Sequence, residues 1–161
     1  MADLPRHAIS VRQPWAWAIV HAGKDIENRS WRAPNAGLHF RGPVCIHAAK
    51  GMTKGEYEDA SDFMAHIAVG CPLPDELQRG GIIGVAEVID IVRDSTSPWW
   101  MGPRGLVLAN VRPVPFIPVG GQLGFFEWKR MEGGPDTPAR WMTRYGDPAE
   151  IAFEERTGEL F

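Results

Sequence analysis

The apolar runs of this chain are short, and glycine or proline lies near the ends of each of them. Short runs rich in β-branched residues are typical of strands, because helices need longer periodic segments. Few of these runs are separated by the helical segment that a βαβ unit requires, so the sequence predicts a mainly β, α+β fold: a small mixed β-barrel with flanking helices. The predicted strands are residues 8–11, 43–50, 82–92, 105–111 and 124–128.

Two segments carry clear helix signals. Pro14 suits the first turn of a helix over residues 15–21, and Gly23 stands where that helix would end in the left-handed conformation. Residues 53–56, Thr-Lys-Gly-Glu, form a capping box ahead of apolar residues at helical spacing. This pattern predicts a second helix, which we expect to end at Gly70.

Three prolines, at positions 113, 115 and 118, follow the fourth predicted strand. Proline has no N–H group and cannot donate to the hydrogen-bond ladder of a central strand. We therefore expect this segment to lie at the edge of a sheet or to form an extended connection.

The length of 161 residues fits one domain. We expect a domain over residues 1–132 and a C-terminal extension, residues 133–161, with a short helix that ends near Gly158 and packs on the same domain. No apolar run approaches the ~20 residues of a membrane span, and the first residues lack the apolar core of a secretory signal. A cytoplasmic location is expected, with Cys45 and Cys71 as reduced thiols.

Lysine and arginine are concentrated in the first third of the chain. Residues 5–50 carry seven of them against two acids, whereas residues 51–161 carry ten against seventeen acids. This segregation favours a basic face on a protein whose formal net charge is −3. The alternative is that the acidic side chains fold back onto the basic ones.

The most unusual stretch is residues 23–31, Gly-Lys-Asp-Ile-Glu-Asn-Arg-Ser-Trp, in which charged residues alternate with apolar or aromatic ones. Residues 10–17, Ser-Val-Arg-Gln-Pro-Trp-Ala-Trp, mix tryptophan with arginine and glutamine. This mixture is typical of a basic, aromatic cleft for a nucleotide or a single strand. The expected partner is RNA, another single-stranded nucleic acid or a nucleoside. A protein partner is the alternative.

Lys24 and Glu27 form the central pair of this stretch. Opposite charges within ~4–6 Å favour each other's charged forms, and such a pair can position a base edge or a phosphate, or act as acid and base. Residues three apart on a strand point to opposite faces, so the pair requires a turn or a bulge. The alternative is an exposed ion pair worth ~0–1 kcal/mol.

Arg12 and Arg29 can each make forked contacts to phosphate, which lysine cannot imitate. Alternatively, they fix the motif by bonding backbone carbonyls or Glu27. Gln13 can either read a base edge or cap the start of the first helix.

Trp15 and Trp100 are the candidate stacking surfaces, since stacking of a base on an aromatic ring contributes ~1–3 kcal/mol. The competing interpretation is that these tryptophans belong to the core. His47 and Lys50 follow the charged stretch on a predicted strand and are candidates for the border of the same cleft.

Neither a metal nor a cofactor is expected. The five histidines show no recognisable ligand spacing. The chain also contains no G-x-S-x-G elbow and no Walker loop.

The chain resembles the ASCH domain, a module of the PUA-like superfamily. The resemblance implies a PUA-like β-barrel with flanking helices and a cleft lined by the central motif. In related modules that cleft is linked to RNA, modified bases or nucleotides. The resemblance covers residues 8 to about 128, and it rests on residues 9–16, 23–31 and 46–51 and, more weakly, on residues 84–88 and 105–111.

Some ASCH-like proteins hydrolyse acetylated cytidine with a lysine at the position resembling Lys24 and a threonine three residues later, where this chain has Glu27. A carboxylate cannot do what an alcohol does in acyl transfer without a change of mechanism. Three hypotheses follow from the resemblance. The first is a module that binds RNA or a modified nucleotide. The second is a small amidohydrolase or ribonuclease that uses Lys24 and Glu27, and the third is a protein-interaction module in transcription or translation regulation.

Overall fold

The structure, a computed structural model, describes residues 3–31, 35–149 and 151. The strands are β1 (His7–Val11), β2 (Ile26–Arg29), β3 (Gly42–Ala48), β4 (Gly81–Val92), β5 (Arg104–Pro118) and β6 (Phe125–Glu127). The α-helices are α1 (Trp15–His21), α2 (Lys54–His66) and α3 (Arg140–Thr143), and the 3-10 helices are η1 (Ala36–His39) and η2 (Pro74–Glu76). No helix in the described ranges is long and apolar enough to cross a membrane.

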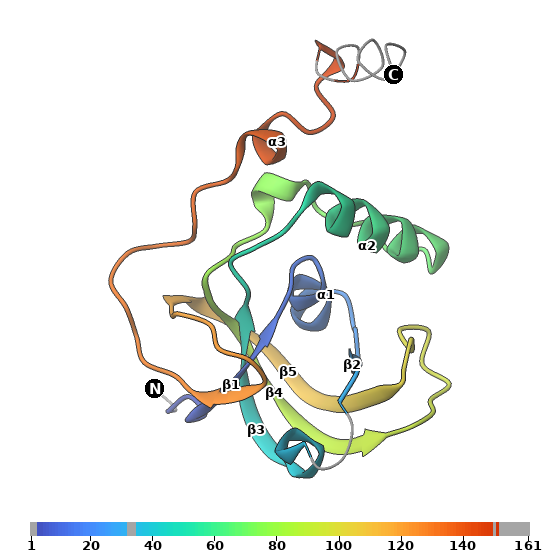
Figure 1. Cartoon of the computed structure of the whole chain (residues 1–161), viewed down its shortest axis with the longest axis vertical. Coiled ribbons are helices and arrows are strands. Elements are labelled where there is room, and N and C mark those ends of the chain that lie inside the picture. Colours follow the sequence, from blue (N-terminus) through green and yellow to red (C-terminus); the bar gives the residue numbers. More distant parts are fainter. Residues whose placement is uncertain (1–2, 32–34, 150, 152–161) are drawn as a thin grey trace.

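The strands form one curled sheet in the order β2-β5-β4-β3-β1-β6. Strands β1 and β3 are parallel and the other pairs are antiparallel, so the sheet is mixed. Figure 1 shows the sheet as a half-barrel, with α1 over its concave side and α2 beyond α1. The predicted α+β, PUA-like fold with flanking helices is confirmed.

The core cluster that includes α1 lies between this helix and the concave face of the sheet. Ile19 of α1 packs with Ile46 of β3 and Leu106 of β5, and each is at most 2% exposed. The burial of Val44, Ile46 and Ala48 on this side follows from the two-residue period of β3. Helix α1 is thereby held rigidly, together with the chain that enters and leaves it.

Strand β5 continues beyond its predicted end, through the three prolines to Pro118. Only its first residues, Arg104 to Val107, pair with β2, and β4 is the one described strand that pairs with the rest. The other side of this stretch is therefore a sheet edge, where a missing N–H group removes no ladder bond. The prediction of an edge position for the prolines is confirmed.

Helix α2 begins at the predicted capping box, since Thr53 Oγ1 accepts from the Glu56 amide at 3.1 Å. The prediction that it continues to Gly70 is wrong, because the helix ends at His66 and Ala68 adopts a left-handed conformation with φ 61°. The prediction failed because apolar residues at helical spacing, Ile67 and Ala68, continue beyond the last turn of the helix.

The C-terminal segment contains α3, which the sequence analysis did not predict. Trp141 of α3 and the following Tyr145 pack around Tyr57 of α2, with the two tyrosine rings 5.0 Å apart. The predicted helix that ends near Gly158 lies largely outside the described residues. The domain boundary at residue 132 stays a prediction.

Candidate functional site

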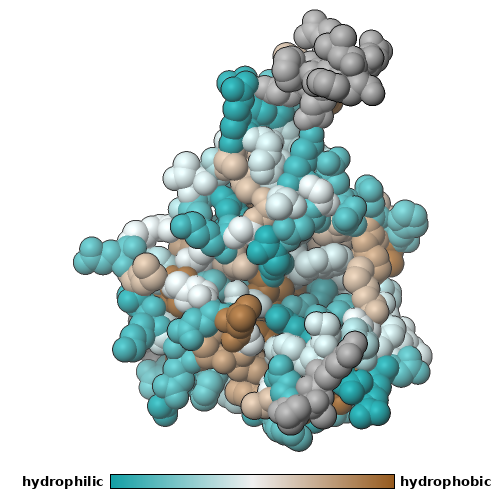
Figure 2. Space-filling view, in the orientation of Figure 1, coloured by the Kyte–Doolittle hydropathy of each residue, from teal (hydrophilic) through white to brown (hydrophobic). Residues whose placement is uncertain are grey.

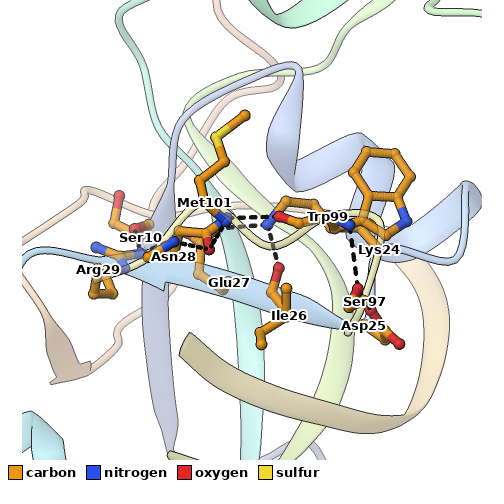
Figure 3. Close-up of polar contacts among 11 residues, drawn as sticks. Ser10, Lys24, Asp25, Ile26, Glu27, Asn28, Arg29, Ser97, Trp99 and Met101 are labelled. Carbon is orange, nitrogen blue, oxygen red and sulfur yellow. Dashed lines mark hydrogen bonds and ion pairs between the residues drawn. The ribbon is translucent and has the colours of Figure 1, made fainter. Parts of the chain in front are cut away.

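A cavity of about 430 Å³ opens between β2, the start of α1, α2 and the connection from β4 to β5. Five of the predicted site residues line it: Arg12, Trp15, Lys24, Glu27 and Arg29. The other lining residues are Ser10, Asn28, Glu56, Asp59, Ala60 and Met101. The two sequence clusters around residues 12 and 27 therefore converge on one site, and Figure 3 shows the β2 side of it.

Lys24 and Glu27 meet because they do not share a strand. Helix α1 ends at His21, Gly23 follows with a φ of +71°, and β2 begins only at Ile26. Lys24 lies in the turn between them, 2% exposed, and its Nζ donates to the Ile26 carbonyl and to Glu27 Oε1 at 2.9 Å. The turn that the pair requires is therefore present.

The Glu27 carboxylate is held between two cations. Its Oε1 accepts from Lys24, and its Oε2 accepts from Arg29 Nη2 at 3.0 Å. Burial would raise the pKa of Glu27, but the charges and hydrogen bonds of Lys24 and Arg29 outweigh it and keep this pKa below its ordinary value. Glu27 is thus an ionised, buried carboxylate at neutral pH.

Arg29 connects the site to β1. Its Nη2 also donates to the Ser10 carbonyl at 2.7 Å, and its guanidinium lies over the Trp31 ring, 5.3 Å from the ring centre. Its Nε is buried without a hydrogen-bond partner, and no described residue accepts a bond from Nη1. One end of the guanidinium therefore retains donor capacity.

Trp15 forms an apolar wall of the cavity. Its half-buried ring packs edge-on against Phe63 of α2 at 5.6 Å, and Lys24 Nζ lies 5.7 Å from its centre. The ring is thus fixed in orientation, as a stacking surface must be.

Arg12 stands at the exposed rim, where a two-pronged ion pair joins it to Glu56 of α2. Its Nε donates to Oε2 at 2.5 Å and its Nη2 to Oε1 at 2.7 Å. The hydrogen bond from Arg12 lowers the pKa of Glu56, against a smaller opposing effect of burial. This pair ties the start of α1 to the start of α2.

The lining residues balance three cations, Arg12, Lys24 and Arg29, against three carboxylates, Glu27, Glu56 and Asp59. At this cavity the acids fold back onto the basic stretch, as in the alternative interpretation of the charge pattern. Such a site suits a ligand with both donors and acceptors better than a run of phosphates.

Asn28 and Met101 were not predicted as site residues. Asn28 Nδ2 donates to the Trp99 carbonyl at 2.9 Å, and its Oδ1 accepts from the amides of Met101 and Gly102. Asparagine is uncommon in strands, so its occurrence at position 28 within the charged stretch is the sequence feature that could have marked it as a site residue. Met101 and the α2 residue Asp59 carried no such signal, since only the tertiary fold brings them to the cavity.

Gln13 and His47 do not line this cavity. Gln13 is 1% exposed, and its side chain accepts from the Trp17 amide and donates to the Gln78 carbonyl, both at 2.8 Å, which fixes the start of α1. His47, also 1% exposed, lies behind the site with Nδ1 3.1 Å from Ser10 Oγ.

Lys50 and Trp100 lie apart from the cavity lining as well. Lys50 is exposed, and its carbonyl accepts a hydrogen bond from Arg79. Trp100 is half-buried and covers Gly102 and Gly105. Within the described parts of the chain, no three His, Cys, Asp or Glu side chains gather in a way that would hold a metal ion.

A comparison with protein families matches residues 9–106 to the ASCH domain. The chain belongs to the ASCH domain family. ASCH domains are PUA-like and are generally linked to RNA binding, and all the residues that line the cavity fall within the matched range of this ASCH domain. A comparison with curated proteins found no match.

Proposed function

We propose that this ASCH protein binds RNA by taking one base, standard or modified, into the cavity beside β2. The observation that carries the proposal is the buried triad of Lys24, Glu27 and Arg29 on the cavity wall. A buried ion pair often stabilises a fold no more than well-packed apolar side chains do, because removing the charges from water is costly. Interaction with a ligand, rather than a gain in stability, would explain why three charged side chains are placed on the cavity wall.

The triad supports recognition of a base edge. Each Glu27 oxygen receives one hydrogen bond from the protein, and a carboxylate has about four acceptor positions in all. Arg29 lines the same cavity and has donor capacity left on its guanidinium, so the site can meet both polarities of a base. Trp15 provides the apolar surface on which the ring of the base would stack.

Arg12 supports contact with the backbone of the RNA. Its side chain is 50% exposed at the rim, so it can reach a phosphate outside the cavity. Few phosphate contacts are available here, so we expect affinity to fall with salt at a slope of about −1 to −2 on logarithmic axes, since each contact contributes ~0.7 for a single strand.

The test is a titration of the native tryptophan fluorescence with short single-stranded RNA, matching DNA, and nucleosides that include acetylated cytidine, at two salt concentrations. We expect quenching by RNA in the wild-type protein and reduced affinity in Glu27→Gln and Arg12→Ala. Glu127→Gln and Arg41→Ala are matched controls at exposed ion pairs that do not line the cavity. Alanine at Lys24 or Arg29 is less informative, because both side chains also hold the fold.

Two results would overturn the proposal. One is the absence of a response to RNA and to every nucleoside at low salt. The other is an unchanged affinity in both Glu27→Gln and Arg12→Ala. Thermal unfolding of each variant in parallel separates loss of binding from loss of structure.

A hydrolase that acts on a nucleoside or RNA is the second candidate. It is favoured by the 2.9 Å contact between Lys24 Nζ and Glu27 at the cavity wall. With its pKa lowered, Glu27 would act as a base rather than an acid. Product formed in molar excess over protein, and abolished by Glu27→Gln, would establish turnover. Binding without formation of product would exclude the hydrolase and support the binding module.

A further inference from the structure

A second cavity, of about 640 Å³, lies on the other side of Arg29. Its lining is different in kind from that of the first cavity. Aromatic and imidazole rings dominate it, and none of the described residues that line it carries a carboxylate. We call it the aromatic cavity, and its rings are those of His7, Trp31, His39, Phe40 and Phe125.

The rings of the aromatic cavity come from three separate parts of the chain and pack on one another. Phe40, directly after η1, stacks on Phe125 of β6 with ring centres 4.0 Å apart and an angle of 14° between the planes. Trp31, which follows β2, lies 5.7 Å from Phe125. The rings of Trp31, Phe40 and Phe125 thus fix one another, so this part of the surface is formed before any ligand arrives.

Leu123 extends this surface into solvent. It lines the aromatic cavity and is 99% exposed. In Figure 2, a patch of hydrophobic residues lies over the connection between β5 and β6, on a face that is otherwise largely hydrophilic. An exposed apolar side chain beside fixed rings is typical of a binding surface rather than of a core.

Arg29 is the residue that the two cavities share. Its guanidinium is oriented by Glu27, the Ser10 carbonyl and the Trp31 ring. No described residue accepts a hydrogen bond from its Nη1. An oriented guanidinium between two nucleotide-sized cavities is placed to contact the phosphate that would join their occupants.

We propose that the aromatic cavity is a second nucleotide subsite, so that the protein binds at least two neighbouring nucleotides of single-stranded RNA, with Arg29 at the phosphate between them. The proposal rests on the function proposed above, because the first cavity must hold a base. Stacking on rings tolerates any base, so the aromatic cavity would add affinity while the triad adds selectivity.

The experiment compares the 5′-monophosphates of adenosine, cytidine and uridine with the matching RNA tetranucleotides. We expect the tetranucleotide of the preferred base to bind about tenfold more tightly than its mononucleotide, within the range for one added stack. Phe40→Leu should weaken tetranucleotide binding by about five- to tenfold and leave mononucleotide binding unchanged, because it removes a stacking ring and preserves an apolar side chain.

Leu123→Ala provides a second variant that cannot unfold the core, since the side chain is 99% exposed. It should weaken the tetranucleotide about two- to threefold by removing apolar contact area. The matched controls are Phe116→Leu, at a half-buried ring that lines neither cavity, and Leu73→Ala, at a leucine that is 51% exposed.

The outcomes separate this inference from the proposed function. Tetranucleotides that bind no tighter than mononucleotides, or tetranucleotide binding unchanged in both variants, would overturn the aromatic subsite alone. Equal weakening of mononucleotides and tetranucleotides would also overturn it, because the cavity would then not be a separate subsite. Absence of binding by every nucleotide would instead overturn the proposed function and this inference with it.

Discussion

At the scale of single residues, the site depends on Glu27. This carboxylate is 8% exposed and receives hydrogen bonds from Lys24 and Arg29. Lys24 is more deeply buried still, at 2% exposed, so its charge is compensated almost entirely within the protein. Removing the carboxylate would leave two cations without their shared partner, in a part of the fold that water reaches poorly.

We expect Glu27→Ala to lower the free energy of unfolding by about 3–5 kcal/mol, the range for removing one partner of a buried ion pair. Glu27→Gln should cost less, because its amide oxygen still accepts one of the two hydrogen bonds. Urea unfolding measures both values. Glu127→Gln is the control, since its ion pair with Arg6 is exposed. A wild-type midpoint in Glu27→Ala would contradict this account of the triad.

At the scale of elements, α2 contributes one wall of the cavity through Glu56, Asp59 and Ala60. Its first turn is fixed twice over. Thr53 and Glu56 form the capping box, and the same Glu56 side chain binds Arg12 beside α1. The position of this wall therefore depends on a local helix signal and on one long-range ion pair.

Thr53→Ala should destabilise the protein by about 1 kcal/mol, because the amide of Glu56 loses its acceptor at the N-terminus of the helix. Thr53→Ser retains the oxygen and should recover most of this loss. Denaturant unfolding of both variants checks the expectation. Equal stability of Thr53→Ala and the wild type would show that the capping box adds nothing beyond the Arg12 contact.

At the scale of the whole molecule, His47 joins parts of the fold that are distant in sequence. From β3 its ring reaches Ser10 of β1 at 3.1 Å and the Val119 carbonyl, just after β5, at 2.7 Å. Gly121 lies so near that a Cβ there would be 2.8 Å from the ring. His47 thus supports the β5–β6 connection, which carries part of the aromatic cavity.

This arrangement predicts a dependence of stability on pH. Burial lowers the pKa of His47 below 6.5, with the Val119 carbonyl and Asp136 acting in the opposite direction. The unfolded chain therefore binds more protons than the folded protein below about pH 6.5, so the free energy of unfolding should fall as pH drops from 7 towards the lowered pKa.

Thermal or urea unfolding between pH 7 and 5 measures this slope. His47→Gln should show a shallower slope over the same range, because the residue that titrates is gone. His66→Gln, at an exposed histidine on α2, is the control and should follow the wild type. Identical slopes for His47→Gln and the wild type would contradict the role assigned to His47.

Much of the fold was predictable because its signals are local. Gly23 lies just beyond the end of α1 with a positive φ, the capping box starts α2, and the two-residue alternation of β3 divides its side chains between two faces. Backbone sterics and hydrogen bonds within a few residues determine these features. The resemblance of residues 23–31 to the ASCH domain added the family, which the match over residues 9–106 confirmed.

The site itself was only partly predictable, because burial and pairing depend on residues far apart in the chain. The sequence alone singled out Lys24, Glu27 and Arg29, but it could not tell an exposed ion pair from a buried triad. It also could not bring Asp59 of α2 to the cavity, or place Phe125 of β6 against Phe40. The amino-acid sequence alone determined which chemical groups the chain carries and where the turn after α1 and the start of α2 lie. The packing of the sheet, α1 and α2 decided which of those groups share a cavity.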